Sequence, residues 1–302
     1  MNSILVVGSA ALDTIETAAG KADDCVGGSA LYFTAGASLF APVSVVSVVG
    51  KDFPHKKIEF LAQRKVDLGS LEIADGKTFR WGGRYDKNLL SRETLFTELN
   101  TFETFEPKIP EHLQNTDLLF LGNILPELQM SVLNQITKPK FVLLDTMNLW
   151  INHRLEALLQ VIAKVDAIVV NDEEVRQLTG FVNIPKAVKK LHSMGPKLVI
   201  VKRGEHGATL HHVDGDFFAL PALPIEEVVD PTGCGDSFAG GFIGRLAMEG
   251  VLTPATFRRA LVSGTVVASF TVQAFGLDRL VTVTPSELAA QEAKLLSAVR
   301  VP

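Results

Sequence analysis

The chain has 302 residues, of which 47% are hydrophobic and 21% charged, and its formal net charge is −5. This is the composition of an ordinary globular protein with enough apolar residues for a substantial core. The negative charge gives no electrostatic reason to bind a polyanion, so nucleic acid is not an expected partner. The only cysteines, Cys25 and Cys234, are too few for a disulfide framework, which favours a reducing cytoplasm.

The N-terminus carries a short apolar run, residues 4–7, with no basic region before it, unlike a secretory signal. The most apolar internal stretch, residues 41–50, is interrupted by Pro42, Ser44 and Ser47. It is far shorter than the roughly 20 residues that a membrane-spanning helix needs. We therefore expect no membrane attachment and interpret residues 4–7 as the first strand.

Short apolar runs rich in branched residues recur along the chain and predict buried parallel strands. They span residues 4–7, 43–49, 118–121, 141–144, 167–170 and 198–201. Segments with helical spacing, such as residues 155–162 and 187–191, lie between several of them. This alternation predicts an α/β fold with a doubly wound, mainly parallel sheet that helices flank on both faces. A final amphipathic helix is expected from Pro285 onward. No repeat, low-complexity tract or linker marks a boundary, so residues 1–302 are expected to form a single domain.

Residues 77–105 interrupt this rhythm, because apolar and polar side chains alternate there with a period of two. The pattern predicts a half-exposed antiparallel ribbon, with Phe79, Trp81 and Tyr85 on one face and two arginines on the other. The apolar face needs cover. Two interpretations stay open, a small β lid over a substrate and a contact between two copies of the chain in a homodimer.

The strongest chemical signal is a glycine-rich turn that runs into a helical pattern, Asp230-Pro231-Thr232-Gly233-Cys234-Gly235-Asp236. Glycines let the backbone approach an anion closely, and the free N–H groups at a helix start suit the charge on a transferred phosphoryl group. A carboxylate at Asp236, beside this expected anion hole, can accept the proton of an attacking hydroxyl. An isolated Gly-x-Gly turn more often only joins a strand to a helix, but this motif is longer.

The motif resembles the signature of the ribokinase-like (PfkB) family, Asp-Thr-x-Gly-x-Gly-Asp followed by a helix, and departs from it only at Pro231. The resemblance implies an ATP-dependent kinase that phosphorylates a hydroxyl of a small-molecule sugar or nucleoside, with Asp236 as the catalytic base. It also implies an anion hole made by the amides of Gly233, Cys234 and Gly235.

The same resemblance assigns a metal role to two other residues of the motif. Asp230 and Thr232 lie where the family often binds a monovalent cation, which makes K⁺ a candidate ion in addition to ATP and Mg²⁺.

Two features near the N-terminus fit the acceptor side of the family pattern. Asp13 matches an early aspartate that binds substrate hydroxyls, and Gly27 and Gly28 match a glycine pair beside the sugar. From the residues alone, a solvated loop carboxylate is the alternative for Asp13, and paired glycines usually mark a turn or hinge. The resemblance places lid segments at about residues 13–26 and 77–105.

Two further matches fit the nucleotide side. Asn171 and Glu174 fit an Asn-x-x-Glu element that holds Mg²⁺ through water, for which hard oxygen ligands are suited. As a bare sequence, the same residues are more typical of a helix N-cap with an acidic first turn, and the two interpretations are compatible. Lys202, Gly204 and Gly207 resemble a nucleotide-binding turn, for which a plain hairpin turn is the alternative.

Three alternatives stay open. Gly8-Ser9-Ala10 after the first strand hints at an NAD-dependent oxidoreductase, although Asp13 replaces the third glycine of that fingerprint. A non-catalytic binding protein of the same fold is the second, which the intact Asp236 disfavours. Within the kinase class, the ribbon resembles a branch with nucleoside kinases more than ribokinase, yet other sugar kinases remain open.

Overall fold

The computed structural model describes residues 1–89 and 91–300. Strand β1 (Ile4–Val7) shows why the sheet is buried. Ile4 and Val6 pack into one apolar cluster, whereas Leu5 and Val7 pack into a second one on the opposite face. A strand that is apolar on both faces requires a layer of helices on each side of its sheet.

The large sheet has nine strands, and the neighbouring strands from β11 to β5 all run parallel. In spatial order the strands are β13 (Phe217–Leu220), β12 (Ala208–His212), β11 (Leu198–Lys202), β10 (Ala167–Asn171), β9 (Phe141–Asp145), β8 (Leu118–Leu121), β1, β4 (Val43–Gly50) and β5 (Val66–Ala74). The β11–β12 and β12–β13 pairs are antiparallel. Every strand predicted from an apolar run is present, and each ends within one residue of its predicted bounds.

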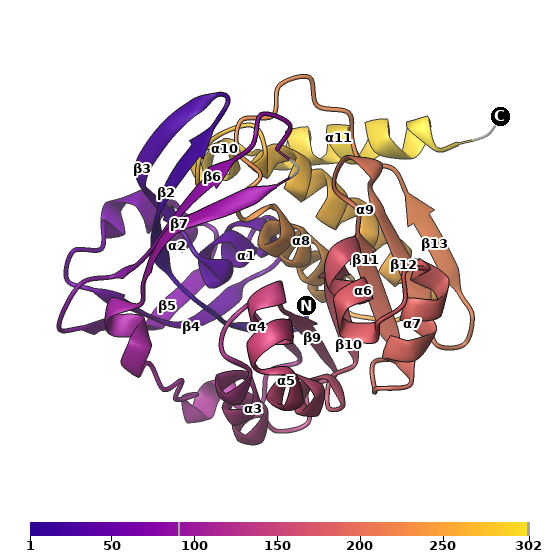
Figure 1. Ribbon diagram of the computed structural model, residues 1–302, viewed down its shortest axis with the longest axis horizontal. Helices are drawn as coiled ribbons and strands as arrows, with labels where there is room; N and C mark the ends of the chain where they lie inside the picture. Colours follow the sequence, from indigo (N-terminus) through magenta and orange to yellow (C-terminus); the bar gives the residue numbers. More distant parts are fainter. Residues whose placement is uncertain (90, 301–302) are drawn as a thin grey trace.

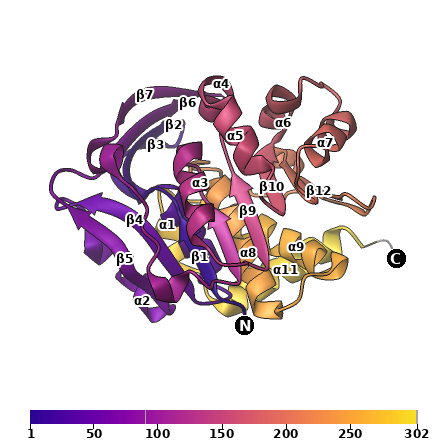
Figure 2. The same ribbon diagram turned by 90° about the horizontal axis from the view of Figure 1, so that it is seen from below.

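Helices cover both faces of this sheet, as predicted (Figures 1 and 2). One face packs against α1 (Ser29–Ala37), α2 (Glu59–Gln63), α8 (Cys234–Glu249), α9 (Pro254–Thr271), α10 (Asp278–Thr282) and α11 (Pro285–Ala298). The other packs against α3 (Pro126–Gln135), α4 (Asn148–His153), α5 (Leu155–Ile162), α6 (Asp172–Thr179) and α7 (Ile184–His192). Among the described residues, no helix has the length and apolar character needed to cross a bilayer.

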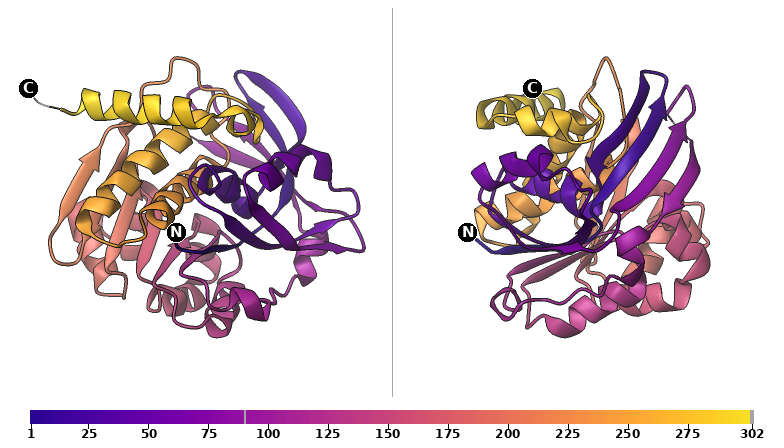
Figure 3. Two further views of the ribbon diagram at one scale, coloured as in Figure 1. Left: turned by 180° about the vertical axis from the view of Figure 1, so that it is seen from behind. Right: turned by 90° about the vertical axis from the view of Figure 1, so that its left-hand side faces the viewer.

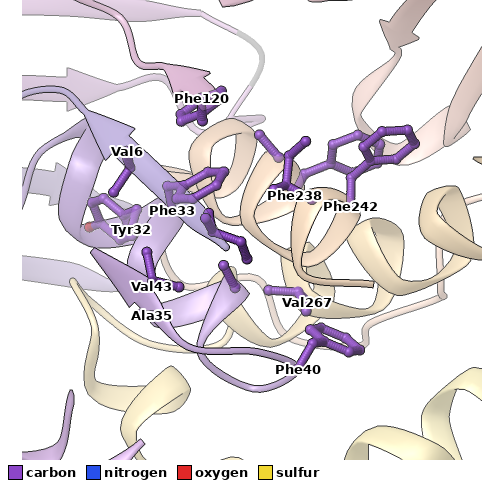
Figure 4. Close-up of a cluster of buried hydrophobic side chains, with 14 of the residues drawn as sticks. Val6, Tyr32, Phe33, Ala35, Phe40, Val43, Phe120, Phe238, Phe242 and Val267 are labelled. Carbon is purple, nitrogen blue, oxygen red and sulfur yellow. The ribbon is translucent and has the colours of Figure 1, made fainter. Parts of the chain in front are cut away.

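The core on the first face is built around α1 and α8. Phe33 of α1 stacks on Phe120 of β8 with ring centroids 4.2 Å apart, and Phe238 and Phe242 of α8 lie beside them (Figure 4). Glycines on α8 let the two helices approach, because a Cβ at Gly240 would lie 2.2 Å from a backbone oxygen of α1. This packing fixes the position of α8, whose N-terminus carries the glycine-rich motif.

A second, four-stranded sheet contains both of the expected lid segments. Its order is β3 (Gly20–Gly27), β2 (Ala11–Thr17), β6 (Phe79–Tyr85) and β7 (Arg92–Glu98). Strands β6 and β7 are antiparallel, which confirms the predicted ribbon, and β2 pairs with β6 in parallel. Figure 3 shows these strands running side by side along one flank of the molecule.

The small sheet is joined to the rest of the chain by short connections. Residues 8–10 lead from β1 into β2, Gly28 alone separates β3 from α1, and residues 75–78 lead from β5 into β6. The last of these is held in place, because both the amide and the hydroxyl of Thr78 donate to Asp52 Oδ1 at 2.7 Å. Since β1 and β5 enter the small sheet from their carboxyl ends, it lies at that edge of the large sheet.

Candidate active site

The glycine-rich turn begins helix α8 at the centre of the molecule (Figure 1). Gly233 precedes the helix with φ +71°, and a Cβ there would lie 2.2 Å from the Tyr32 ring, so no other residue fits. The amide of Cys234 donates within the turn to the Pro231 carbonyl at 3.2 Å. The amides of Gly233 and Gly235 have no hydrogen-bond partner among the described residues. Two of the three amides expected in the anion hole are therefore available to a ligand.

Asp236 lies in the first turn of α8, and its Oδ1 is enclosed by protein without a hydrogen-bond partner among residues 1–89 and 91–300. Burial, and then the neighbouring Asp145, raise the pKa of Asp236 to about 7, although Lys202 opposes the shift. A carboxylate with that pKa is half ionised near neutral pH and can take up a proton, which is the property a general base needs.

Lys202 and Asp145 stand at the ends of two parallel strands and form an ion pair beside the turn. Lys202 Nζ is 3.6 Å from Asp145 Oδ1, and a Cβ on Gly235 would lie 2.6 Å from the same Nζ. Burial alone would lower the pKa of Lys202, but Asp145, Glu174 and Asp236 outweigh it and the pKa is raised. Lys202 therefore presents a positive charge next to the amide of Gly235.

Asp145 was not among the residues predicted for the site. It is buried, and burial raises its pKa even though Lys202 acts in the opposite direction. The sequence signal was a carboxylate directly after the apolar run 141–144, at the carboxyl end of a strand that is buried on both faces. In open α/β sheets, ligands bind at that edge.

Asn171 and Glu174 form a capping box at the start of α6. The Asn171 side chain accepts from the amides of Glu173 and Glu174, and Glu174 Oε2 accepts the Asn171 amide at 2.7 Å. The N-cap interpretation is thus confirmed. Burial, against the opposing effect of Lys202, also raises the pKa of Glu174 to about 7.

The turn at Gly204 and Gly207 joins the antiparallel strands β11 and β12, so its backbone is that of a hairpin connection. Gly207 has φ +86°, and a Cβ there would lie 2.0 Å from the Leu220 carbonyl oxygen. Packing against β13 accounts for Gly207. Gly204 has open space around it, and its contribution to nucleotide binding stays a prediction.

Asp13 lies on the small sheet and is only 4% exposed, which excludes the solvated-loop interpretation. Burial, together with Asp230 and Asp236, raises its pKa to about 8. A Cβ on Gly27 would lie 2.1 Å from Asp13 Oδ2, so this glycine makes room for the carboxylate. Gly28 has φ +91° and begins α1. The expected acceptor residues are therefore close to each other.

Asp230 and Thr232 precede the helix and are held by local contacts. Asp230 is 1% exposed and accepts the Thr232 amide at 2.8 Å and the Gly276 amide at 3.4 Å. Burial raises its pKa. The Thr232 hydroxyl lies 3.0 Å from the hydroxyl of Tyr85 on the small sheet. No ion pair to Asp230 occurs within the described part of the chain.

Tyr32 is a buried neighbour of both glycine motifs that the sequence did not reveal. Its ring lies against Gly233 and Gly27, and its hydroxyl is buried without a hydrogen-bond partner among the described residues. Burial, then Asp230 and Asp13, raise its pKa well above the usual value. Every residue of α1 is buried, so the sequence has no periodic pattern that would distinguish Tyr32 from the other core residues.

Among the described residues, no group of three or more His, Cys, Asp or Glu side chains is arranged to hold a metal ion by itself. A metal ion at this edge would take most of its ligands from water and from the phosphates of a nucleotide.

The profile of the pfkB family carbohydrate kinases matches residues 1–282. Cytidine kinase of Thermococcus kodakarensis is 32% identical over 250 residues, which cover 80% of this chain and 88% of that protein. Ribokinase of Arabidopsis thaliana is 34% identical over 88 residues, 28% of this chain and 23% of that protein.

Solved structures share the fold over almost the whole chain. The nucleoside kinase of Burkholderia thailandensis in complex with inosine has a TM-score of 0.78 and 19% identity, with 97% of this chain and 99% of that chain covered. Arabidopsis thaliana ribokinase complexed with ribose and ATP has a TM-score of 0.74 and 22% identity, with 96% and 98% covered. The predicted ribokinase-like fold is confirmed. The chain belongs to the pfkB family of carbohydrate kinases, which are phosphotransferases that act on a hydroxyl group of a sugar or nucleoside.

Proposed function

We propose that this chain is an ATP-dependent kinase that phosphorylates a hydroxyl of a nucleoside, with Asp236 as the general base. The observation that carries the proposal is the environment of Asp236. Its Oδ1 is enclosed yet unpartnered among the described residues, and it lies at the start of α8 beside the free amide of Gly235 and Lys202. A base and a set of anion-stabilising groups at one place are what phosphoryl transfer to an alcohol needs.

The roles of the residues follow from this arrangement. Asp236 takes the proton of the acceptor hydroxyl as the oxygen forms its bond to the γ-phosphorus and the bond to the bridging oxygen breaks, which releases ADP. The amides of Gly233 and Gly235 and the start of α8 meet the charge on the transferred group. Lys202 adds a full positive charge that Asp145 holds in place.

The residues present fit a magnesium nucleotide. Glu174 has a raised pKa, because burial leaves its carboxylate short of compensating charge, and Lys202 alone does not restore the ordinary value. Mg²⁺, when bound, neutralises phosphate charge. Glu174 and Asn171 would hold it through water, with the phosphates as the remaining ligands.

A monovalent cation is proposed at Asp230 and Thr232. Asp230 is almost fully buried and has no ion pair within the described residues, so a bound K⁺ would offset the cost of burying its charge. Turnover measured in K⁺ against an equal concentration of a large organic cation tests this. Equal rates in both salts contradict the cation site.

The nucleoside is preferred over a free sugar on two grounds. The cytidine kinase relative is similar over most of the chain. On the small sheet, the register places Trp81 beside Asp13, so an aromatic surface adjoins the carboxylate expected to bind sugar hydroxyls. A nucleobase offers such a ring a flat apolar face, whereas ribose does not.

The test is a panel of nucleosides and sugars incubated with MgATP, in which the phosphorylated product is identified by mass and ADP release is measured in parallel. We expect transfer to at least one nucleoside with higher kcat/KM than to ribose. Faster transfer to ribose or another sugar contradicts the acceptor preference. Nucleotide binding without transfer to any acceptor favours a non-catalytic binding protein instead. The family match already sets aside the NAD-dependent oxidoreductase.

A further inference from the structure

The chain contains two tyrosines, and both contact the turn that precedes α8. Tyr32 packs its ring against Gly233 from the side of α1. Tyr85 approaches from the small sheet, and its hydroxyl lies 3.0 Å from Thr232 Oγ1, although the two residues are 147 positions apart in the sequence. The turn is thus held by the buried core on one side and by the small sheet on the other.

Thr232 transmits this contact to the expected anion hole. Its amide is fixed by Asp230 Oδ1 at 2.8 Å, and the next residue, Gly233, begins the helix that carries Asp236. A shift of the Thr232 side chain therefore moves the amides that follow it directly in the chain.

The other end of the contact is oriented by neighbours on the small sheet. Tyr85 is the register partner of Arg92, whose guanidinium lies 5.0 Å from the centre of the Trp81 ring. Trp81 in turn is the register partner of Asp13. Partners in register share a face of a sheet. The strands that would cover an acceptor are therefore the strands that hydrogen-bond to the phosphoryl-binding turn.

We propose that Tyr85 is a positioning residue that couples the small sheet to the anion-hole turn through its hydrogen bond to Thr232. The proposal rests on the function proposed above and deepens it. When the small sheet settles on an acceptor, Tyr85 fixes Thr232 and so aligns the amides of Gly233 and Gly235 with the transferred group. Because ATP is expected to bind at Lys202 and the β11–β12 turn, its affinity is not expected to depend on this bond.

The kinetic test uses Tyr85→Phe, Thr232→Val and the double variant. Loss of one well-placed hydrogen bond in the transition state lowers kcat by about 5- to 30-fold, with KM for ATP within about twofold of wild type. Because both changes remove the same bond, the double variant is expected to be no slower than the slower single one. Thr232→Ser, which keeps the hydroxyl, is expected to recover most of the turnover that Thr232→Val loses.

The matched control is Thr137→Val, which removes an exposed hydroxyl from the connection between α3 and β9 and is expected to leave kcat unchanged. Wild-type kcat in Tyr85→Phe overturns the proposal. So do losses that multiply in the double variant, because independent effects would mean that the two residues do not act through a shared bond.

A second measurement tests the coupling without using activity. In hydrogen exchange on the unliganded protein, Tyr85→Phe and Thr232→Val are both expected to speed exchange in residues 230–236 and in β6, and Thr137→Val in neither. Unchanged exchange in residues 230–236 overturns the coupling. If the wild-type protein phosphorylates no acceptor, the proposed function fails, and the exchange rates still show whether Tyr85 holds the turn.

Discussion

Asp236 and Asp166 are both partly buried carboxylates. Asp236 lies at the carboxyl ends of the parallel strands, whereas Asp166 lies at their amino ends. Asp166 precedes β10 and accepts the Val142 amide at 2.9 Å, whereas Asp236 Oδ1 has no partner among the described residues. Asp236→Asn is expected to lower kcat by roughly 10²- to 10⁴-fold, the usual range for a positioned base, with ATP binding within a few-fold. Steady-state kinetics and ATP titration measure this. Asp166→Asn is the control and is expected to keep wild-type kcat, and near-normal turnover in Asp236→Asn contradicts the assignment.

The raised pKa of Asp236 predicts how turnover depends on pH. The base acts only when ionised, and its pKa is about 7, so kcat/KM for the acceptor is expected to fall as the pH drops below that value. The fall approaches about tenfold per pH unit well below the pKa. A pH profile of kcat/KM measures it. A flat profile down to pH about 5 would show that no group with this pKa controls the reaction.

At the scale of residues, the chemistry of the residues themselves predicted only the part of the candidate site that lies in one contiguous motif. Asp13, Asn171, Glu174 and Lys202 were predicted from the family resemblance. Residues 230–236 carry the glycines, the acidic groups and the helix start together, so their proximity needs no knowledge of the fold. Asp145 and Tyr32 were missed, because each joins the site only through contacts between distant segments. Asp145 meets Lys202 across β10, and Tyr32 meets Gly233 across the packing of α1 on α8.

At the scale of structural elements, the turn before α8 contains two glycines, Gly233 and Gly235, whose surroundings differ. A Cβ at Gly235 would meet only the flexible end of Lys202, whereas one at Gly233 would meet the Tyr32 ring with φ at +71°. Gly235→Ala is therefore expected to lower kcat at least tenfold with little change in the urea midpoint. Gly233→Ala is expected to lower the free energy of unfolding by about 2–4 kcal/mol. Equal losses of stability in both variants would contradict this separation.

The small sheet is expected to respond to the acceptor. If it covers the acceptor, hydrogen exchange in residues 78–105 slows on binding, and a nucleoside protects the strand that carries Trp81 more than ribose does. Asp13→Ala is expected to weaken both acceptors, since its carboxylate would bind hydroxyls common to both. Exchange that no acceptor changes would instead assign this sheet to a contact between two copies of the chain, which analytical ultracentrifugation detects.

Strands of the large sheet were predictable because both of their faces are buried, which gives continuous apolar runs. Strand β5 was missed, since it lies at the edge of the sheet and most of its side chains are partly or fully exposed. The β2–β3 hairpin was not predicted, and only a lid segment at about residues 13–26 was expected from the family resemblance. Asp13, Asp23 and Asp24 interrupt its apolar pattern, and the pairing of β2 with β6 joins segments more than 60 residues apart.

For the molecule as a whole, the buried acids make stability depend on pH. Asp13 has a folded pKa of about 8, far above its value of 3.8 in the unfolded chain, so the native state holds a proton that the unfolded state has lost. This stabilisation is full at low pH and disappears as the pH rises through 8. Asp236 and Glu174, with pKa values of about 7, act in the same direction.

We expect the free energy of unfolding to decrease between pH about 7 and pH about 8.5, by at most about 1.4 kcal/mol per pH unit for each such group. Above pH about 7, the opposite contribution of His211, whose folded pKa is about 4, is already complete. Urea denaturation at both pH values measures the effect. Asp13→Asn is expected to reduce it, and an unchanged pH dependence in that variant would show that Asp13 is not the group that titrates.

The short connections of the small sheet restrict how it can move. Residues 8–10, Gly28 and residues 75–78 are too few to unravel or reorder, and Thr78 is anchored by Asp52. If the small sheet closes over an acceptor, we expect it to rotate as a whole about these attachment points. Because such a rotation would order no long segment, we expect the entropic cost of closure to reduce the acceptor's binding free energy only slightly.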